Sequence, residues 1–260
     1  MTAAAGVPAY TAAVFKPRAA RYCVCVPVLN ENGRLKLQLQ RMRPFLGQID
    51  IVIADGGSTD GSVNAEILKM QGARALLVKT GPGRLGAQLR MALRWALDQD
   101  YAGVITIDGN NKDDPAAIPA FIAALDNGVD HVQGSRFIPG GRAVRTPWRR
   151  WLGVRLLHAP LISWAAGFRY TDTTNGFRAY SRRLLEDPRV AVFRDELSGY
   201  ELHYYLAIRA ARLGLRVAEI PVTREYPFGK APTKISGWRG NWNILRTLWK
   251  TIRGDYNPTP

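Results

Sequence analysis

Short apolar runs and longer amphipathic stretches alternate along the first half of the chain. The apolar runs, which predict strands, cover residues 22–28, 49–54, 73–78 and 104–107. A helical spacing of apolar residues follows each run and ends near residues 45, 70, 96 and 125. Four strand-and-helix repeats of this length are typical of βαβ units, so the pattern predicts an α/β fold with a mostly parallel, doubly wound sheet.

The second half has a less regular pattern. Strands are expected within residues 129–136, 171–180 and 215–220. Helices are expected over residues 198–213 and 238–252.

The pattern divides the chain into three parts. Residues 1–20 are alanine-rich and hold two prolines, which predicts a flexible, poorly ordered arm. Residues 21–236 are long enough to form one folded domain with a full core. Residues 237–260 would form a basic amphipathic helix and a tail.

The apolar run at 104–107 ends in a loop of acidic and amide residues that includes Asp108 and Asn110. Ligands of open α/β sheets bind in the crevice beyond the carboxyl ends of the strands, which is where both side chains would lie. A carboxylate beside amide oxygens suits a hard cation such as Mg²⁺ or Mn²⁺, and such a cation suits a diphosphate. The alternative is an ordinary strand-to-helix loop with polar turn residues.

Two further loops at predicted strand ends could contact a ligand. Asp55 precedes two glycines, so its carboxylate could bind a nucleobase or ribose; the alternative is a tight turn. Gly83 and Arg84 precede a helix, where phosphate is favoured; the alternative is a turn with a solvated arginine. The chain contains neither the glycine pattern of dinucleotide-binding folds nor that of a P-loop.

The charge balance calls for an anionic partner. The 260 residues carry a formal net charge of +15, which suits a nucleic acid, a membrane surface or a phosphate-bearing substrate. Cys23 and Cys25 would share one face of a strand without bridging, which predicts buried thiols in a reducing cytoplasm. No apolar run reaches the length of a spanning helix, so we expect a soluble or peripheral protein.

Six short motifs resemble those of family-two inverting glycosyltransferases, in particular the polyprenyl-phosphate (dolichyl-phosphate-like) hexosyltransferases. The motifs are PVLNE at 27–31, DGGSTDG at 55–61, DGN at 108–110, GSRF at 134–137, TNGFRAY at 174–180 and EIPV at 219–222. Each is weakly specific alone, whereas six in order over residues 22–240 are strongly specific. The resemblance implies the glycosyltransferase-A (nucleotide-diphospho-sugar transferase) fold, with residues 21–236 as its catalytic domain.

The resemblance also implies roles for individual residues. The nucleotide would lie near Pro27, Asn30, Glu31 and Asp55. The metal and the donor diphosphate would lie at Asp108 and Asn110. Arg136 and arginines of the 142–155 segment, such as Arg149, would face the acceptor phosphate or the departing diphosphate. Arg84 and Arg178 are further candidates for substrate binding. Lys234 matches a mobile loop that reaches the donor phosphates.

The chain departs from the family pattern at two positions. Asn110 stands where the family has the second aspartate of its metal motif, which lowers the charge of the site, although Asp113 and Asp114 could compensate. Gly56 stands where the family usually has the second aspartate of an Asp-Asp-Gly-Ser loop, which could alter recognition of the base.

Asp195, Glu196 and Glu201 lie where relatives with hydroxyl acceptors place a catalytic base. A phosphate acceptor is already nucleophilic and needs no strong base, whereas a hydroxyl needs one. The alternative is that these acids favour the start of a helix.

We therefore expect a cytoplasmic, metal-dependent hexosyltransferase that uses UDP- or GDP-hexose and an acceptor such as a lipid phosphate or a cell-envelope glycan. Trp242 and Trp249 would share one face of the C-terminal helix beside basic residues, which suits the inner face of the membrane. The alternative is that this helix packs its tryptophans on the core. Two rival functions remain: a nucleic-acid-binding protein, which no known binding motif supports, and a sugar-nucleotide binder made inactive by Asn110.

Overall fold

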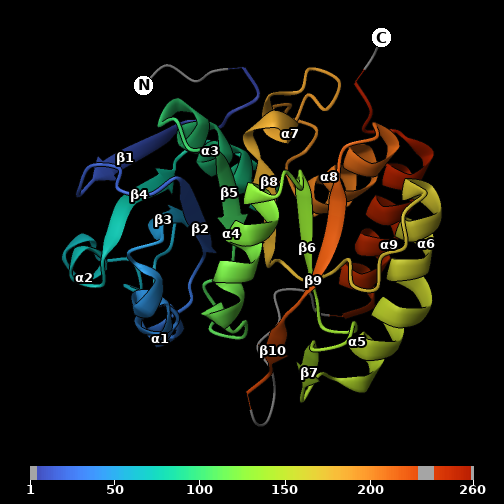
Figure 1. The fold of residues 1–260 in the computed structure, drawn as a ribbon, viewed down its shortest axis with the longest axis horizontal. Coiled ribbons are helices and arrows are strands. Elements are labelled where there is room, and N and C mark those ends of the chain that lie inside the picture. The colour runs from blue at the N-terminus through green and yellow to red at the C-terminus, as the bar shows by residue number, and fades with distance from the viewer. Residues whose placement is uncertain (1–4, 228–236, 259–260) are drawn as a thin grey trace.

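A computed structural model of the chain describes residues 5–227 and 237–258. Over these residues a mostly parallel sheet of eight strands has the order β1-β4-β3-β2-β5-β8-β6-β9 (Figure 1). The strands are β1 (Tyr10–Val14), β2 (Tyr22–Val28), β3 (Ile49–Asp55), β4 (Ala73–Lys79), β5 (Gly103–Thr106), β6 (His131–Ser135), β8 (Arg178–Ser181) and β9 (Val217–Pro221). β1 and β8 run antiparallel to their neighbours, and the other pairs are parallel.

The four predicted strand-and-helix repeats are confirmed, and each predicted strand agrees with β2, β3, β4 or β5 to within one residue. The helices of these repeats are α1 (Gly33–Met42), α2 (Ala65–Met70), α3 (Leu85–Asp98) and α4 (Ile118–Asp126). Single 3₁₀ turns, η1 (Arg43–Phe45) and η2 (Pro115–Ala117), extend α1 and precede α4. The Asp114 side chain accepts a hydrogen bond from the amide of Ala116 at 3.1 Å, so the acidic loop itself caps the element that follows.

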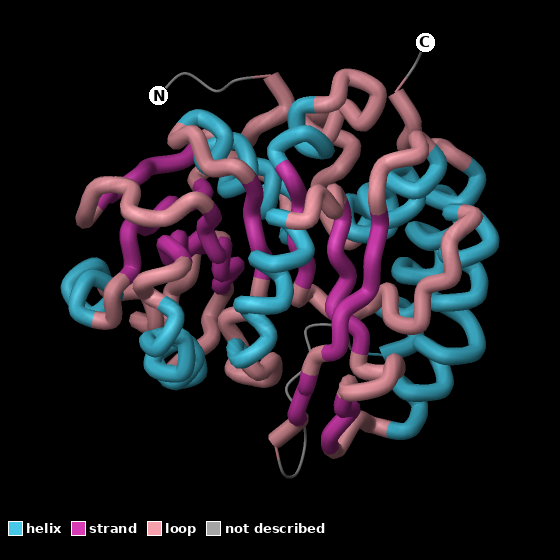
Figure 2. Tube along the Cα trace, in the orientation of Figure 1, coloured by secondary structure: helices cyan, strands magenta, loops and turns pink. Residues whose placement is uncertain are grey.

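Helices cover both faces of the sheet (Figure 2). On one face α3 packs over Cys23 and Cys25 of β2; on the other, α1, α2 and α4 pack over Val24 and Val26. Alternate residues of β2 thus divide between the faces, as the period of a strand requires. Both cysteines are buried free thiols, as predicted.

The prediction of a poorly ordered arm at residues 1–20 is wrong for residues 10–14. These residues form β1, which pairs antiparallel with β4 from Tyr10 opposite Lys79 to Val14 opposite Ala75. Most of β1 is exposed, so its sequence shows no apolar signal. The strand forms because its backbone amides and carbonyls pair with those on the open edge of β4, and that edge exists only in the folded sheet.

The second half contains the expected α8 (Glu201–Arg212) and β9, but the strand expected within 171–180 is reduced to β8. Residues 171–177 instead form a polar loop. A short helix, α7 (Arg182–Glu186), follows β8. β7 (Arg142–Val144) and β10 (Thr223–Glu225) pair in parallel as a small separate sheet below the large one in Figure 1.

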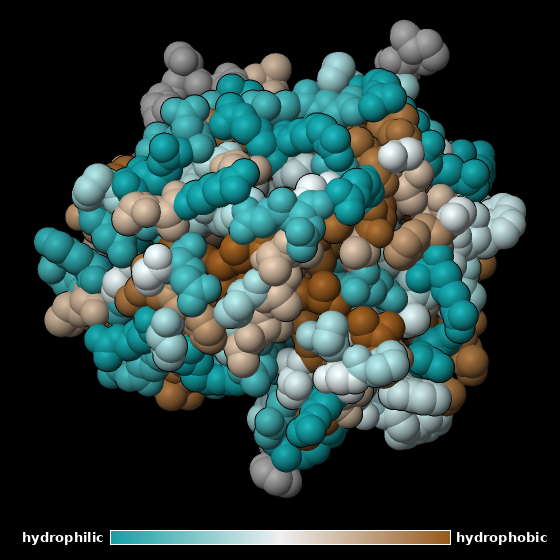
Figure 3. Space-filling view, in the orientation of Figure 1, coloured by the Kyte–Doolittle hydropathy of each residue, from teal (hydrophilic) through white to brown (hydrophobic). Residues whose placement is uncertain are grey.

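A layer of helices packs beside β6 and β9 (Figure 1). It comprises α5 (Trp148–Leu152), a π-helical segment (Gly153–His158), α6 (Ala159–Ala166), α8 and the predicted α9 (Gly237–Arg253). Leu248 of α9 is buried in one cluster with Ile162 of α6 and Tyr204 of α8. None of the helices in the described parts of the chain combines the length and hydropathy that crossing a membrane requires. The face seen in Figure 3 is largely hydrophilic, with hydrophobic residues gathered near its centre and along one side.

Candidate active site

Asp108 lies just beyond the end of β5, at the carboxyl ends of the central strands. The loop is tied to β2, because the amide of Gly109 donates to the carbonyl of Pro27 at 3.4 Å. The Asp108 side chain is 28% exposed. Its Oδ2 accepts a hydrogen bond from Nδ2 of Asn110 at 3.3 Å. The two residues predicted to form the metal and diphosphate site therefore lie together.

Arg224 of β10, which the sequence analysis did not single out, joins Asp108 to Asp113. Its Nη2 donates to Oδ2 of Asp108 at 3.0 Å, and its Nη1 donates to Oδ2 of Asp113. Asp113 is fully buried, and burial raises the pKa of its carboxyl to about 6 although Arg224 opposes this shift. Burial acts to lower the pKa of Arg224, but Asp113 and Asp108 outweigh burial and raise it. Arg224 lies two residues after the EIPV motif, and no feature of the sequence marks it as a partner of Asp108.

Tyr226 gathers further cations beside this ion-pair group. The Lys112 ammonium lies 5.0 Å from the centre of its ring, and Nη1 of Arg150 donates to its hydroxyl at 2.9 Å. Burial acts to raise the pKa of Tyr226, but Arg224 and Arg150 outweigh burial and lower it. Burial, followed by the charge of Arg224, lowers the pKa of the Lys112 ammonium.

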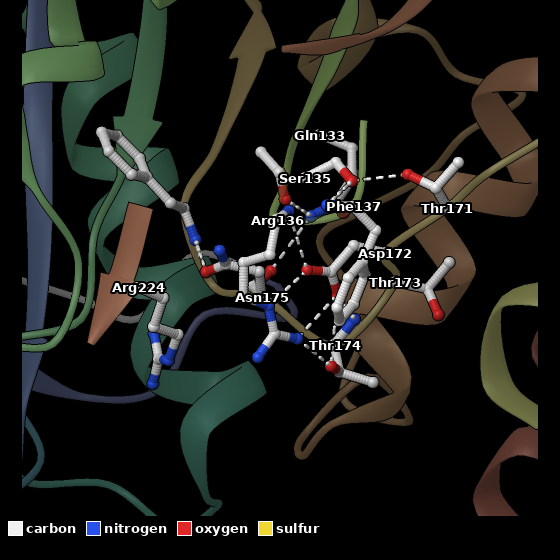
Figure 4. Close-up of polar contacts among 12 residues, drawn as sticks. Gln133, Ser135, Arg136, Phe137, Thr171, Asp172, Thr173, Thr174, Asn175 and Arg224 are labelled. Carbon is white, nitrogen blue, oxygen red and sulfur yellow. Dashed lines mark hydrogen bonds and ion pairs between the residues drawn. The ribbon is translucent and has the colours of Figure 1, made fainter. Parts of the chain in front are cut away.

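Arg136 and Arg178 were predicted to contact a substrate, and in the structure both guanidinium groups are bonded to groups of the protein itself. Nε and Nη2 of Arg136 donate to the two carboxylate oxygens of Asp172 at 2.6 and 2.9 Å, and Nη2 also donates to Thr174 at 3.0 Å (Figure 4). Both members of the Arg136–Asp172 pair are buried. Arg178 is also buried, and its guanidinium donates to three backbone carbonyls, those of Thr173, Asn175 and His203. Both arginines hold the 171–177 loop in place, because a buried guanidinium needs several acceptors.

The two loops predicted to surround the nucleotide are bonded to each other. Oδ1 of Asn30 accepts from the amide of Thr59 at 2.8 Å, and the amide of Asn30 donates to Oγ of Ser58 at 3.0 Å. The buried carboxylate of Asp55 accepts from the amide and hydroxyl of Ser58, at 3.0 and 2.6 Å to Oδ1. Glu31 forms an ion pair with Arg34 at 3.0 Å. The hydrogen bonds of Asp55 to Ser58 are those expected if Asp55 is a tight-turn residue. The nucleotide-binding roles of Asn30, Glu31 and Asp55 stay predictions.

The predicted phosphate site at Gly83 and Arg84 is not open at the helix terminus. Gly83 adopts a φ of +101°, and Arg84 precedes α3 with an exposed side chain. The amides of Arg84 and Ala87 both donate to the carbonyl of Ser198, at 3.0 and 3.1 Å. The first turn of α3 thus has its hydrogen-bond partner within the protein, because the 197–199 loop covers it.

Two of the three acids proposed as a base are bonded to groups of the protein itself. Asp195 is 83% exposed and pairs with Nη1 of Arg90 on α3 at 3.2 Å. Glu196 is exposed. Glu201 is buried in the first turn of α8, and its carboxylate accepts from the amide of Gly199. The contacts of Glu201 match the alternative in which acids favour a helix start.

Two predicted residues remain. Arg149 is exposed on α5 beside Trp148, whereas its neighbour Arg150 reaches Tyr226. Lys234 lies outside the described residues, and so does most of the loop that carries it.

The side chains around Asp108 fit a divalent cation poorly. In the described parts of the chain, no three His, Cys, Asp or Glu residues are grouped so that they could hold a metal. Oδ2 of Asp108 already accepts from Arg224 and Asn110, and Oδ1 of Asn110 accepts from the amide of Lys112 at 3.2 Å. The two acids that could compensate for Asn110 are engaged: Asp113 with Arg224, and Asp114 with Arg41 at 3.1 Å.

A mostly parallel sheet with carboxylate and amide side chains beyond the ends of β2, β3 and β5 is the architecture expected of a nucleotide-diphospho-sugar transferase. The model of the family described as glycosyl transferase family 2 matches residues 23–188. The chain belongs to this family, as its motifs predicted.

Curated relatives and a solved structure extend the comparison. A polyprenol monophosphomannose synthase of Mycolicibacterium smegmatis is 30% identical over 90% of this chain and 88% of its own length. An undecaprenyl-phosphate mannosyltransferase of Micrococcus luteus is 30% identical over 78% of this chain and 83% of its own. Glucosyl-3-phosphoglycerate synthase of Mycobacterium tuberculosis, solved with Mn²⁺, UDP-glucose and phosphoglyceric acid, superposes with a TM-score of 0.62. It is 21% identical and covers 92% of this chain and 80% of its own, a likeness that confirms the predicted glycosyltransferase-A fold.

Proposed function

We propose that the protein transfers a hexose from a nucleotide-diphospho-sugar to a polyprenyl phosphate, with inversion at the anomeric carbon. One observation carries the proposal: Asp108 and Asn110 lie at the carboxyl end of β5, inside a chain 30% identical over most of its length to two polyprenyl-phosphate mannosyltransferases. Mannose is the favoured hexose because both relatives are named for it. Both UDP and GDP remain as candidate donor nucleotides.

The state of the acids supports a phosphate acceptor over a hydroxyl. A phosphate oxygen can attack in line with the departing diphosphate without a base. The carboxylate of Glu201 accepts from the amide of Gly199, and that of Asp195 pairs with Arg90, so both already have partners within the protein. A hydroxyl acceptor would need a free base.

A divalent cation at Asp108, Mg²⁺ or Mn²⁺, is supported by the solved neighbour that holds Mn²⁺ with UDP-glucose. When bound, such an ion stabilises the charge that develops on a leaving diphosphate. Asp108 and the carbonyl of Asn110 are the residues that would hold it. Their hydrogen bonds to Arg224 and to the amide of Lys112 make this donor set weak.

A position at the inner face of the cell membrane is supported by exposed tryptophans. Trp164 of α6 and Trp242 and Trp249 of α9 are 72%, 62% and 57% exposed. The alternative was that α9 packs its tryptophans on the core. Trp242 and Trp249 are mostly exposed instead, and Leu248 is the α9 residue that packs into the buried cluster with α6 and α8. Tryptophan beside basic side chains such as Lys250 suits the headgroup region, where the acceptor phosphate of a polyprenyl lipid would lie.

The test is a transfer assay with the full-length protein and vesicles that contain polyprenyl phosphate. UDP- and GDP-linked glucose and mannose are supplied in turn, and the lipid fraction is analysed for a hexosyl phosphate product. We expect product with one donor, and loss of turnover by roughly 10²–10³-fold in Asp108→Ala. Asp98→Asn, which alters an exposed aspartate on α3, is the matched control.

Two outcomes would contradict the proposal. Nucleotide-sugar binding without transfer to any acceptor would favour the inactive binder. Strong, salt-dependent affinity for DNA without nucleotide-sugar binding would favour the nucleic-acid-binding protein.

A further inference from the structure

Gln88 of α3 carries a polar side chain to the ends of β2 and β3. The residue is 4% exposed, so the protein fixes almost all of its side chain. Its Nε2 donates to the carbonyl of Val28, the last residue of β2, at 2.8 Å, and also to the carbonyl of Ala54 on β3. The first turn of α3 is itself bonded to the carbonyl of Ser198, so the helix that carries Gln88 is anchored. The side-chain amide of Gln88 therefore joins the two strands at the edge where the predicted nucleotide loops begin.

These two hydrogen bonds fix the orientation of the amide. If the amide were turned over, Oε1 of Gln88 would face two carbonyl oxygens, and both carbonyls would lose this donor. Oε1 therefore points away from the two carbonyls and can act only as an acceptor. No group of the described residues donates to Oε1, yet this oxygen is not fully enclosed by the protein. The small exposed part of Gln88 thus includes an acceptor that a ligand can reach.

The position of Oε1 depends on the glycine at residue 56. A Cβ on Gly56 would lie 3.2 Å from Oε1 of Gln88 and 3.4 Å from the carbonyl oxygen of Val28. Gly56 is partly exposed and follows Asp55 directly, at the end of β3. Because residue 56 has no side chain, the amide of Gln88 can approach the sheet edge from below the loop.

A nucleotide bound at Asp108 would reach this oxygen. In the sheet β2 lies between β3 and β5, and Asp108 follows β5. Neighbouring strands lie roughly 4.8 Å apart, so the end of β3 is about 10 Å from the end of β5. A donor with its diphosphate at Asp108 would then extend its ribose and base past β2 toward Gly56, because a nucleotide is long enough to span two strands. The base would lie beside Oε1 of Gln88.

We propose that Oε1 of Gln88 accepts a hydrogen bond from a ring N–H of the donor nucleobase and so selects uracil or guanine. This inference rests on the proposed transferase function. Uracil and guanine each carry a ring N–H on their base-pairing edge, whereas cytosine and adenine have a bare acceptor nitrogen there. Gln88 cannot turn its amide to suit such a base, because Nε2 is bonded to Val28 and Ala54. Two acceptors would then face each other without a donor, which costs binding free energy.

The first experiment compares nucleoside diphosphates that differ at this edge of the base. Dissociation constants of UDP, GDP, CDP and ADP are measured by calorimetry for the full-length protein in Mn²⁺, together with UDP and GDP methylated at the ring nitrogen. We expect UDP or GDP to bind about tenfold or more tightly than CDP and ADP, and methylation to weaken the preferred nucleotide by a similar factor. Equal binding of the methylated and unmethylated nucleotide would overturn the inference and leave the transferase function intact.

The second experiment separates recognition of the base from the packing of Gln88. Gln88→Ala removes the oxygen, so it should bind the preferred nucleotide and its methylated analogue within about threefold of each other. Its affinity for inorganic pyrophosphate should equal that of the wild type. Gln40→Ala, the same change at an exposed glutamine on α1, is the control and should keep the full discrimination. Equal losses for nucleotide, analogue and pyrophosphate would show that Gln88 only joins β2 and β3, and would contradict the inference.

A change at residue 56 tests the same oxygen without altering Gln88. Gly56→Ala places a Cβ against Oε1 and must displace it, so discrimination against the methylated analogue should fall. Gly56→Asp combined with Gln88→Ala moves the acceptor from α3 to the loop and should recover the discrimination that Gln88→Ala loses. If Gly56→Ala discriminates like the wild type and the double variant recovers nothing, Oε1 does not recognise the base. If the wild-type protein binds neither UDP nor GDP, the transferase function itself falls, and the inference with it.

Discussion

The carboxylate of Asp108 lies against the backbone of Gly176: a Cβ atom on Gly176 would be 2.5 Å from Oδ1 of Asp108. The carbonyl of Gly176 also accepts from Oγ1 of Thr106, at the end of β5, at 2.8 Å. Two motifs that are far apart in the chain, DGN and TNGFRAY, therefore meet at the site. The glycine is required there because any side chain would occupy the position of the carboxylate.

Gly176→Ala should displace Asp108 and reduce kcat/KM at least tenfold, because misplacement of a reacting group by about 1 Å can cost roughly 10²-fold. The backbone of Gly176 is not in the left-handed region, so the thermal midpoint should change little. Gly153→Ala is the control, since a Cβ there meets nothing within 4 Å and the residue lies in a helix. Steady-state kinetics of both variants measure the change in kcat/KM, and thermal melts measure the change in midpoint. Full activity in Gly176→Ala would show that Asp108 need not stay where it lies.

Asp55→Ala should raise the donor KM more than it lowers kcat if the carboxylate binds the nucleotide. The same carboxylate accepts two hydrogen bonds from Ser58, so loosening of the loop is a competing explanation. Ser58→Ala removes the hydroxyl and keeps the carboxylate, and it should leave the donor KM within about threefold of wild type. Equal KM values for the two variants would assign Asp55 to the turn.

Stability should fall as pH falls below 6.5, because His131 is buried in its neutral form. Burial, followed by the charge of Arg178, lowers the pKa of His131 to about 3, and neither ring nitrogen has a hydrogen-bond partner. Between pH 6.5 and 3 the unfolded chain binds a proton at this residue that the native state does not. The free energy of unfolding therefore decreases by about 1.4 kcal/mol per pH unit for this residue as pH falls.

His131→Phe keeps a ring between Tyr170 and Tyr180 and should remove this contribution. Urea unfolding at pH 7 and pH 5 measures it. The stability lost between the two pH values should be smaller in the variant by about 2 kcal/mol. Identical losses in both proteins would mean that His131 does not resist protonation in the native state.

Binding to anionic vesicles should depend on the exposed tryptophans of α9. Trp242→Glu with Trp249→Glu should abolish co-sedimentation at low salt and leave the fold intact, because both side chains are mostly exposed. Met70→Glu changes an equally exposed apolar residue on α2, on the opposite side of the molecule in Figure 1, and should bind like wild type. If the wild-type protein stays in the supernatant, or the double variant unfolds, the membrane surface is not on α9.

The regular half of the fold, and the sheet edge where the candidate site lies, could be predicted from the sequence alone. The apolar runs of β2, β3, β4 and β5 are buried on both faces, and such strands show their limits directly as breaks in hydrophobicity. Because parallel strands end at one edge of the sheet, the sequence alone predicts that Asp55 and Asp108 lie at a common crevice. The family followed from six motifs in order.

Which charged side chains lie at that crevice depends on the tertiary structure. Nothing in the sequence distinguishes Arg224, which donates a hydrogen bond to Asp108, from Arg136 and Arg178, which donate to buried acceptors elsewhere in the protein. β1 could not be predicted from the sequence either, because an exposed edge strand forms through the backbone of the strand it pairs with and not through its own side chains. Local sequence reports periodicity and turn chemistry over a few residues, whereas the pairing of a guanidinium or a strand edge depends on groups brought together from across the chain by folding.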